Sequence, residues 1–515
     1  MPRLNQLSRE DVMFVAGETE SIYQHVAGLV ILDTSNCPDF NYNYFRRHCE
    51  ERISLIPHFR WKLHAVPLGL DRPYWVEDEH FSFDHHIRRV ALPAPGDRAT
   101  LCEVAASLYA NHLDHSKPLW EMWLIEGLEG GGFAYLQKFH HCMMDGEGAL
   151  KMIEVMCDFE ANPSEQKQVD RSISEARAGH VPSTQQRSTR AWRHLVRLPG
   201  DAARGIYNIL RPKLLEQFVW PRSPQEGRPE VPTAPFNGEI SSARAIAVKS
   251  LPIEGLLHIK QHFGVSLNDV VLALVSSALR AYLIDRAELP THSLRTNIPV
   301  SLRTADDDQL SNKVTTTTVT LATNIEDAGK RLQAINAEST AAKAQAHGDG
   351  MGVVELFQMM PPILVSTIMD TLPAEQAPQI LGANLIVSNV RSSPIPLYIA
   401  GARMEKMYPV SILTAGMGIN ITCVSYLDEM DFGVVVDPDL VQGFESIAES
   451  LEQALGEYLA LLQPTRRKPK RKPGTRPGKK TESEKKPTKA TTGKKKKSAA
   501  KNKKSAKHKS KSRAG

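Results

Sequence analysis

Lys138–Met156 has the sequence KFHHCMMDGEGALKMIEVM. An apolar run typical of a strand leads into two adjacent histidines, His140 and His141. Asp145 and Gly146 follow after three residues, and a helical pattern begins at once. No other stretch of the sequence concentrates as many side chains with catalytic potential, so most of the remaining chain is interpreted as scaffold around this one.

The HHxxxDG spacing suits a general base held rigidly by its own loop. Near neutral pH a substantial fraction of a histidine side chain is neutral and able to accept a proton. An aspartate at the turn into a helix can hold that loop through a salt bridge or as the helix N-cap, and glycine permits backbone geometry that other residues resist. A hydroxyl substrate needs such a base to attack a thioester, and the base contributes a factor on the order of 10²–10⁴ in rate.

Two other interpretations of the histidine pair are a metal site and a purely structural role. Adjacent residues of a strand point to opposite faces of the sheet, which disfavours a shared metal ion, and no metal is predicted. A structural role stays open on this motif alone. The sequence contains a second doublet, His85 and His86, which no Asp-Gly follows. The spacing to Asp145 and Gly146 therefore carries more of the signal than the doublet itself.

Charge divides the chain into an acidic body and a basic tail. Residues 464–515 carry 23 Lys and Arg against two acidic residues, whereas the rest of the chain carries 40 against 56. Apolar residues are nearly absent from this tail, so it is predicted to be disordered. Its cations can bind anionic lipid headgroups, at about 1 kcal/mol each, or the phosphates of nucleic acid. The sequence leaves both partners open.

Hydrophobic periodicity predicts α/β (α+β) layers in two domains. A chain of 515 residues is longer than one hydrophobic core usually organises. Apolar periodicity is lost over residues 162–190 and recovered over residues 192–220, where apolar residues alternate with Arg and Lys. This pattern predicts a linker with amphipathic helices over residues 162–236, between an N-terminal domain at 1–161 and a C-terminal domain at 237–463. Helices are expected near 44–56, 99–114, 267–284 and 444–462, and strands near 28–32, 122–125, 315–321, 385–387 and 433–436.

Missing sequence features disfavour several other classes of protein. The sequence has no GxSxG elbow, GxGxxG loop, P-loop or HExxH motif. The first residues lack the apolar core of a signal peptide, and no uninterrupted apolar run reaches the roughly 18 residues of a spanning helix. Six cysteines without a CxxC pair are typical of reduced thiols. A cytoplasmic location is therefore expected, with any membrane contact peripheral.

The segment from His140 to Gly146 resembles the active-site motif of the bacterial wax ester synthase/acyl-CoA:diacylglycerol acyltransferase family. The resemblance extends over roughly residues 5–462. Further stretches resemble the family in the same order: Asp11–Phe14, Pro118–Trp120, Asn268–Val271, Pro299–Arg303, Asn384–Val390, Pro396–Tyr398 and Gly401–Arg403. The chain departs from the family pattern after Val390, where Arg-Ser-Ser-Pro replaces Pro-Gly-Pro, and at Ser311, which replaces a glycine. These departures leave substrate preference open.

The resemblance implies the fold of the CoA-dependent acyltransferase superfamily, which includes chloramphenicol acetyltransferase. That fold has two similar α/β domains with a tunnel between them, entered by acyl-CoA from one side and by the alcohol from the other. The implied activity is O-acyl transfer from acyl-CoA to diacylglycerol, to a long-chain fatty alcohol, or to both, giving triacylglycerol and wax ester. Acyl-CoA is then a substrate, and no cofactor is expected.

The same resemblance assigns roles to the motif residues. His141 is implied to be the general base and His140 a supporting neighbour. Asp145 is implied to be structural and to pair with an arginine, for which Arg60 and Arg303 are equal candidates.

Two further residues, Asn268 and Asp269, fall in a family motif near the tunnel. Capping of a helix that begins there is equally consistent with the sequence. Gly146 is implied to meet a backbone requirement.

The implied substrates are lipids, so we expect contact with the inner face of the plasma membrane or with lipid droplets. Residues 192–220 and 359–365 are candidate interfacial segments, and packing between domains is equally consistent with each. Two alternatives to the main interpretation stay open. One is acyl transfer to another acceptor, such as a sterol, short alcohol or amine, and the other is nucleic-acid binding through the tail with a secondary acyltransferase body. The oligomeric state is not predicted.

Overall fold

The structure is a computed structural model that describes residues 5–144, 152–163, 177–179, 231–301, 314–345 and 360–462, with residues 183, 185–187 and 189. Four predicted features lie outside the described residues wholly or in large part: the Asp145–Gly146 pair, Arg303, the linker and the basic tail.

The first of two large sheets carries the histidine pair. Its strand order is β11-β12-β1-β6-β5-β4, and every pair is antiparallel except β4–β5. The strands are β1 (His25–Asp33), β4 (Ile87–Ala91), β5 (Trp120–Glu126), β6 (Phe133–His140), β11 (Tyr398–Ile399) and β12 (Ala402–Val410). Helices α1 (Arg9–Ala16), α2 (Tyr42–Ile53), α3 (Phe83–His86) and α4 (Arg98–Tyr109) belong to the same part of the chain.

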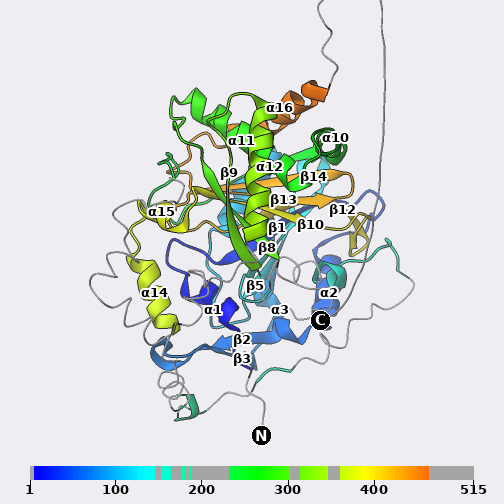
Figure 1. Cartoon of the computed structure of the whole chain (residues 1–515). Coiled ribbons are helices and arrows are strands. Elements are labelled where there is room, and N and C mark those ends of the chain that lie inside the picture. The colour runs from blue at the N-terminus through cyan, green and yellow to red at the C-terminus, as the bar shows by residue number, and fades with distance from the viewer. Residues whose placement is uncertain are drawn as a thin grey trace, which may run out of the picture. The chain divides into compact units, whose positions relative to one another are not determined.

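The second sheet has the order β7-β14-β13-β10-β8-β9. Its strands are β7 (Ala245–Pro252), β8 (Arg295–Ser301), β9 (Val314–Thr320), β10 (Leu385–Arg391), β13 (Ile419–Tyr426) and β14 (Glu429–Val436). Figure 1 shows a layer of helices beside this sheet, formed by α10 (Ile253–Phe263), α11 (Leu267–Asp285), α12 (Ala328–Gln345) and α16 (Glu445–Leu462). These helices and the sheet enclose the largest apolar cluster, which explains why α11 is apolar around most of its circumference.

The two sheets are interleaved in the chain. Strands β11 and β12 lie late in the sequence, yet β12 pairs along β1 in the first sheet. Where β12 crosses β14, the backbones approach so closely that a Cβ at Gly433 would lie 1.8 Å from the carbonyl oxygen of Pro409. A third apolar cluster, centred on α4, contains residues from strands of both sheets. Residues 237–463 therefore do not form their own sheet alone, and the domain boundaries stay a prediction.

Shorter elements complete the described part of the chain. They are η1 (Pro57–Arg60), the hairpin of β2 (Trp61–His64) and β3 (Tyr74–Glu77), the turns η2 (Pro67–Gly69) and η3 (Glu129–Gly131), α14 (Pro362–Thr371) and α15 (Ala377–Leu381). Helix α14 contacts both η2 and α1. This contact places residues late in the sequence beside the N-terminal helix.

The predicted mixed α/β fold is confirmed, and each helix and strand predicted outside the linker has a counterpart within a few residues. The amphipathic helices predicted in the linker lie outside the described residues. By length and composition, helix α11 could cross a membrane, although polar residues interrupt its apolar run. Its most apolar window is 67% buried inside the molecule. Burial of this kind is typical of the central helix of a core.

Candidate active site

Strand β6 ends at the histidine pair, and neighbouring segments hold the backbone there. The His140 N–H donates to the carbonyl of Leu119, with an N–O distance of 2.9 Å, and the His141 N–H donates to the carbonyl of Gln24 at 2.8 Å. A turn follows, in which the Met143 N–H donates to the His140 carbonyl at 2.9 Å. These bonds fix where the two histidine side chains leave the strand.

The ring of His141 lies against a phenylalanine from the N-terminal helix. Its centroid is 4.0 Å from that of Phe14, and the ring planes are 9° apart. Phe14 lies in α1, which begins with Ser8 as N-cap: the Ser8 Oγ accepts a hydrogen bond from the Asp11 N–H at 2.8 Å. The helix is thereby fixed at its start, and Phe14 defines the plane of the predicted base.

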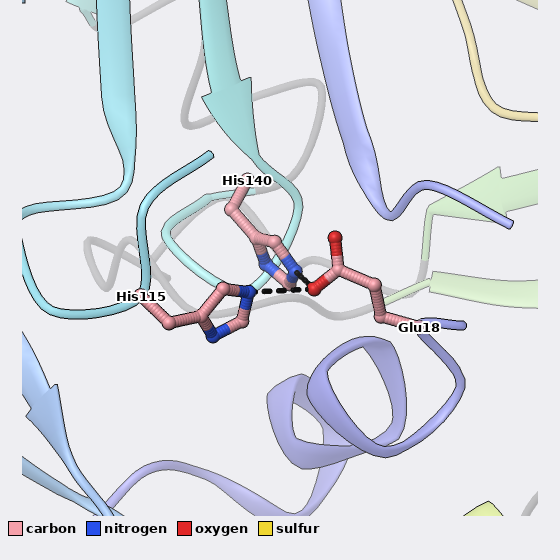
Figure 2. Close-up of side chains that lie close together, drawn as sticks. All are labelled: Glu18, His115 and His140. Carbon is pink, nitrogen blue, oxygen red and sulfur yellow. Dashed lines mark hydrogen bonds and ion pairs between the residues drawn. The ribbon is translucent and has the colours of Figure 1, made fainter. Parts of the chain in front are cut away.

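His140 is fully buried and lies in different surroundings from His141. The Cys142 N–H donates to His140 Nδ1 at 3.1 Å. Because Nδ1 accepts this bond with its electron pair, the neutral ring has its proton on Nε2. Nε2 lies 3.4 Å from Oε2 of Glu18, as Figure 2 shows. Burial is the largest influence on the pKa of His140 and lowers it below the ordinary value despite the opposing effect of Glu18, which is consistent with a neutral ring.

Glu18 accepts from more than one histidine. Its Oε2 lies 2.7 Å from Nε2 of His115, and its Oε1 lies 3.3 Å from Nδ1 of His112. Burial alone would raise the pKa of the Glu18 carboxyl, but the hydrogen bond from His115 and the nearby His140 hold it far below the ordinary value. In return, the bond to Glu18 raises the pKa of His115, against a smaller lowering by burial. The Glu18 carboxylate is therefore ionised at neutral pH and lies beside His140, the neighbour of the predicted base.

Lys138, the first residue of the opening stretch, positions the loop that carries His112 and His115. Its side chain is 0% exposed, and Nζ donates to the carbonyls of Leu108 at 3.1 Å and Asn111 at 2.8 Å. A buried ammonium group needs such partners. The lysine on β6 thus holds the end of α4 in place and keeps His115 beside Glu18.

Glu18, His115 and His140 also have the spacing of a metal site, since their ligand atoms lie within 4.8 Å of one another. Two observations favour a hydrogen-bonded network instead. His140 Nδ1 accepts the Cys142 N–H, so Nε2 carries the proton and has no electron pair for a metal. The 2.7 Å separation between Glu18 and His115 is that of a charge-assisted hydrogen bond.

Of the two predicted partners of Asp145, only Arg60 lies in the described part of the chain. Its guanidinium pairs with Glu77 at 3.0 Å, and both side chains are about half exposed, at 48% and 54%. Because Asp145 and Arg303 lie outside the described residues, the pairing of Asp145 stays a prediction.

Helix capping accounts for Asp269, one of the two alternatives for the Asn268–Asp269 pair. The Ser266 N–H donates to Asp269 Oδ2 at 2.9 Å, and the Asp269 N–H donates to Ser266 Oγ at 3.2 Å, forming a capping box at the start of α11. Asn336 and Ser339 of α12 donate to the same carboxylate at 2.8 and 2.6 Å. Asp269 therefore joins α11 and α12, two helices that pack beside the second sheet. Asn268 is half-buried next to it.

Sequence reasoning missed Glu18, His115 and Lys138. Phe14 stood in a stretch that was recognised, Asp11–Phe14, but its contact with His141 was not foreseen. Glu18 had no signal of its own, because a single glutamate in a polar segment is ordinary. Its partners come from a distant loop and from the end of β6.

Known proteins resemble this chain over most of its length. Residues 7–271 match the wax ester synthase/diacylglycerol acyltransferase catalytic domain, and residues 310–458 match the C-terminal domain of the same family. A Mycobacterium tuberculosis protein named as a diacylglycerol O-acyltransferase is 32% identical over 464 residues, covering 88% of this chain and 90% of its own. The O-acyltransferase WSD of Acinetobacter baylyi is 30% identical over 461 residues, covering 86% and 95%.

Solved structures agree with these matches. A condensation domain of the calcium-dependent antibiotic synthetase has a TM-score of 0.51 at 14% identity, covers 89% of this chain and 96% of its own, and shares the fold. The wax ester synthase/diacylglycerol acyltransferase of Marinobacter aquaeolei has a TM-score of 0.65 at 26% identity and covers 89% and 99%. The family matches and the named relatives thus define an acyltransferase. The chain belongs to the wax ester synthase/diacylglycerol acyltransferase family.

Proposed function

We propose that the protein transfers a fatty acyl group from acyl-CoA to the hydroxyl of diacylglycerol or of a long-chain fatty alcohol, with His141 as the general base. The observation that carries this proposal is the placement of His141 at the end of β6. There its backbone is fixed by the Gln24 carbonyl and its ring by Phe14.

The proposed reaction has a simple proton balance. His141 accepts the hydroxyl proton while the alcohol oxygen attacks the thioester carbonyl carbon. The new C–O bond forms as the C–S bond breaks, and the departing CoA sulfur takes the proton back from His141. The products are an ester and free CoA, and the base returns to its starting state.

The second histidine acts through its neighbours in this proposal. His140 holds the turn after β6 through the Cys142 N–H and faces Glu18 on its other side. A turn held at both ends keeps the His141 ring in one orientation, which matters because general-base catalysis depends on the distance to the proton. His140 and Glu18 are therefore positioning residues.

The acceptor is proposed from the relatives, whose names include both diacylglycerol O-acyltransferase and wax ester synthase. The test offers the purified full chain palmitoyl-CoA with either diacylglycerol or hexadecanol and identifies the ester by mass spectrometry. We expect triacylglycerol, wax ester or both, together with free CoA. Ester formation with neither acceptor would overturn the proposal and favour another acceptor.

We also propose that the protein works at a lipid surface, because its acceptors are lipids that partition into membranes or droplets. The basic tail suits anionic headgroups at such a surface. Nucleic-acid binding through the same tail stays a prediction, and acyl-CoA enters this scheme as a substrate.

A further inference from the structure

An uncharged and partly exposed surface lies one helix away from His141. Two segments form it, residues 65–70 (AVPLGL) and residues 360–369 (MPPILVSTIM), and neither contains a charged residue. Leu68 is 79% exposed and Ile363 is 43% exposed. The segments touch, since a Cβ added at Gly69 would lie 3.4 Å from the Cβ of Ile363. We call this surface the apolar patch.

Leu68 has a backbone conformation that leucine rarely adopts. Its φ of 59° and ψ of 15° lie in the left-handed region, which costs a residue with a Cβ about 1–2 kcal/mol. The same residue leaves its side chain in water, although burying a leucine is favourable by about 1.5–3 kcal/mol. Neither feature stabilises the fold, which makes Leu68 a candidate for a functional role.

The exposed face of α14 is also suited to an apolar environment. The hydroxyls of Ser366 and Thr367 donate to the Ile363 carbonyl at 3.2 and 2.7 Å, and that of Thr371 donates to the Thr367 carbonyl at 2.8 Å. Hydroxyls satisfied within their own helix can enter hydrocarbon without leaving an unpaired donor. The one charged residue of the helix, Asp370, lies at its C-terminal end.

The inner face of α14 connects the apolar patch to the candidate active site. Val365 is 0% exposed and packs in one apolar cluster with Met13 and Ala16 of α1. Phe14 of the same helix stacks on His141. Figure 1 shows α14 at the edge of the molecule with α1 beside it. A lipid that meets the apolar patch is therefore separated by α14 alone from α1, the helix that contacts the proposed base.

The composition of the apolar patch favours lipid over a protein partner. Energetically dominant positions in protein interfaces are enriched in tryptophan, tyrosine and arginine. Neither segment of the patch contains any of these residues, although Arg187 from another segment donates to the Ala65 carbonyl at 3.0 Å. The large exposed side chains, including Leu68 and Ile363, are aliphatic, and the exposed Thr367 hydroxyl donates within its own helix. Aliphatic side chains without charge or unpaired donors are suited to acyl chains.

We propose that the apolar patch docks the protein on a lipid membrane, with Leu68 and Ile363 inserted among the acyl chains, and that diacylglycerol is taken up from that membrane beside α14. This inference rests on the proposed function, because it explains how a membrane-resident acceptor reaches His141. It assigns the recognition of the membrane to the folded body rather than to the basic tail.

The test measures flotation of the full chain with phosphatidylcholine vesicles, with and without diacylglycerol. Neutral vesicles are used so that attraction between the cationic tail and anionic lipids does not contribute to binding. The double variant Leu68→Asp/Ile363→Asp should bind vesicles about tenfold more weakly, since two inserted aliphatic groups are lost. The matched control, Leu257→Asp/Ile284→Asp, changes residues that are 41% and 49% exposed elsewhere on the molecule, and it should bind normally.

Leu68→Gly separates docking from folding. Glycine adopts the left-handed conformation without strain, so thermal stability should not fall, whereas vesicle binding should. Ester formation from vesicle-borne diacylglycerol should decrease in parallel with binding, and activity on detergent-dispersed diacylglycerol should be retained. Equal vesicle binding by the patch variants and the control would overturn the docking proposal. Vesicle binding is measured without catalysis, so a protein that makes no ester would overturn the proposed function alone.

Discussion

The two histidine doublets of the chain each contain a buried histidine, but the groups that contact these histidines differ. His86 is 1% exposed, its Nδ1 lies 2.7 Å from the Trp120 carbonyl, and its ring stacks on the Trp120 indole at 4.4 Å. His140 is equally buried, but its Nε2 lies 3.4 Å from the Glu18 carboxylate. The residue paired with each also differs, since His85 contacts Arg88 and His141 contacts Phe14.

This comparison shows what a nearby carboxylate changes. Burial lowers the pKa of His86 to about 4, more than its bond to the Trp120 carbonyl raises it, so the ring stays neutral and acts as a packed aromatic group. At His140, burial has the same direction, but Glu18 opposes it and links the ring to His115. The Leu119 carbonyl accepts a hydrogen bond from the His140 backbone N–H, and the next carbonyl, that of Trp120, contacts the His86 ring. The two doublets therefore lie close together, but only the one at His140 has a carboxylate beside it.

The largest expected difference between the doublets is in catalysis. His141→Ala should lower kcat by a factor on the order of 10²–10⁴, because no base then takes the hydroxyl proton. His85→Ala, at the partly exposed position of the other doublet, should leave kcat unchanged. Initial rates of CoA release with palmitoyl-CoA and the preferred acceptor measure both. Full activity in His141→Ala would exclude His141 as the base.

Acid stability should distinguish the doublets next. An unfolded histidine has a pKa near 6.5 and His86 has a folded pKa of about 4, so the unfolded chain binds more protons between these values and stability falls as pH falls. The contribution from His86 reaches about 3 kcal/mol at pH 4. His86→Gln lacks this titration, so its free energy of unfolding should decrease less between pH 7 and pH 4 than that of the unsubstituted protein.

Urea unfolding at several pH values measures this slope. His258→Gln is a matched control at a surface position on α10 whose side chain is 57% exposed. Parallel curves for His86→Gln and His258→Gln would contradict the assignment of His86 as a buried neutral ring.

The sequence predicted local features of the fold and missed the distant ones. Helix α11 was predictable because nearly every residue from 267 to 284 is apolar or small. The pairing of β12 with β1 was not, because it joins strands from opposite ends of the chain and periodicity carries no information on partners. The same reason explains which site residues were predicted. The histidine pair lies in one short motif, whereas the contacts of Glu18 with His115 and His140 form only in the folded chain.

The smallest expected effect concerns Glu18, the carboxylate that lies beside one doublet and not the other. Glu18→Gln keeps the shape of the side chain but removes the charge that accepts from His115 and His140. Loss of a charge-assisted hydrogen bond should lower kcat by about ten- to a hundredfold with little change in KM. Glu77→Gln, which breaks the surface pair with Arg60, is the matched control and should leave kcat unchanged.

The pH dependence of stability tests whether Glu18 acts through its charge. Because Glu18 raises the pKa of His115, the pair stabilises the fold fully below pH 6.5 and this stabilisation is lost as pH rises through the raised pKa. His115 is 43% exposed, so solvent limits the effect to about 1 kcal/mol or less. The stability difference between the unsubstituted protein and Glu18→Gln should therefore shrink from pH 6 to pH 9. A constant difference would mean that Glu18 contributes packing rather than charge, and that the two doublets differ less than their contacts indicate.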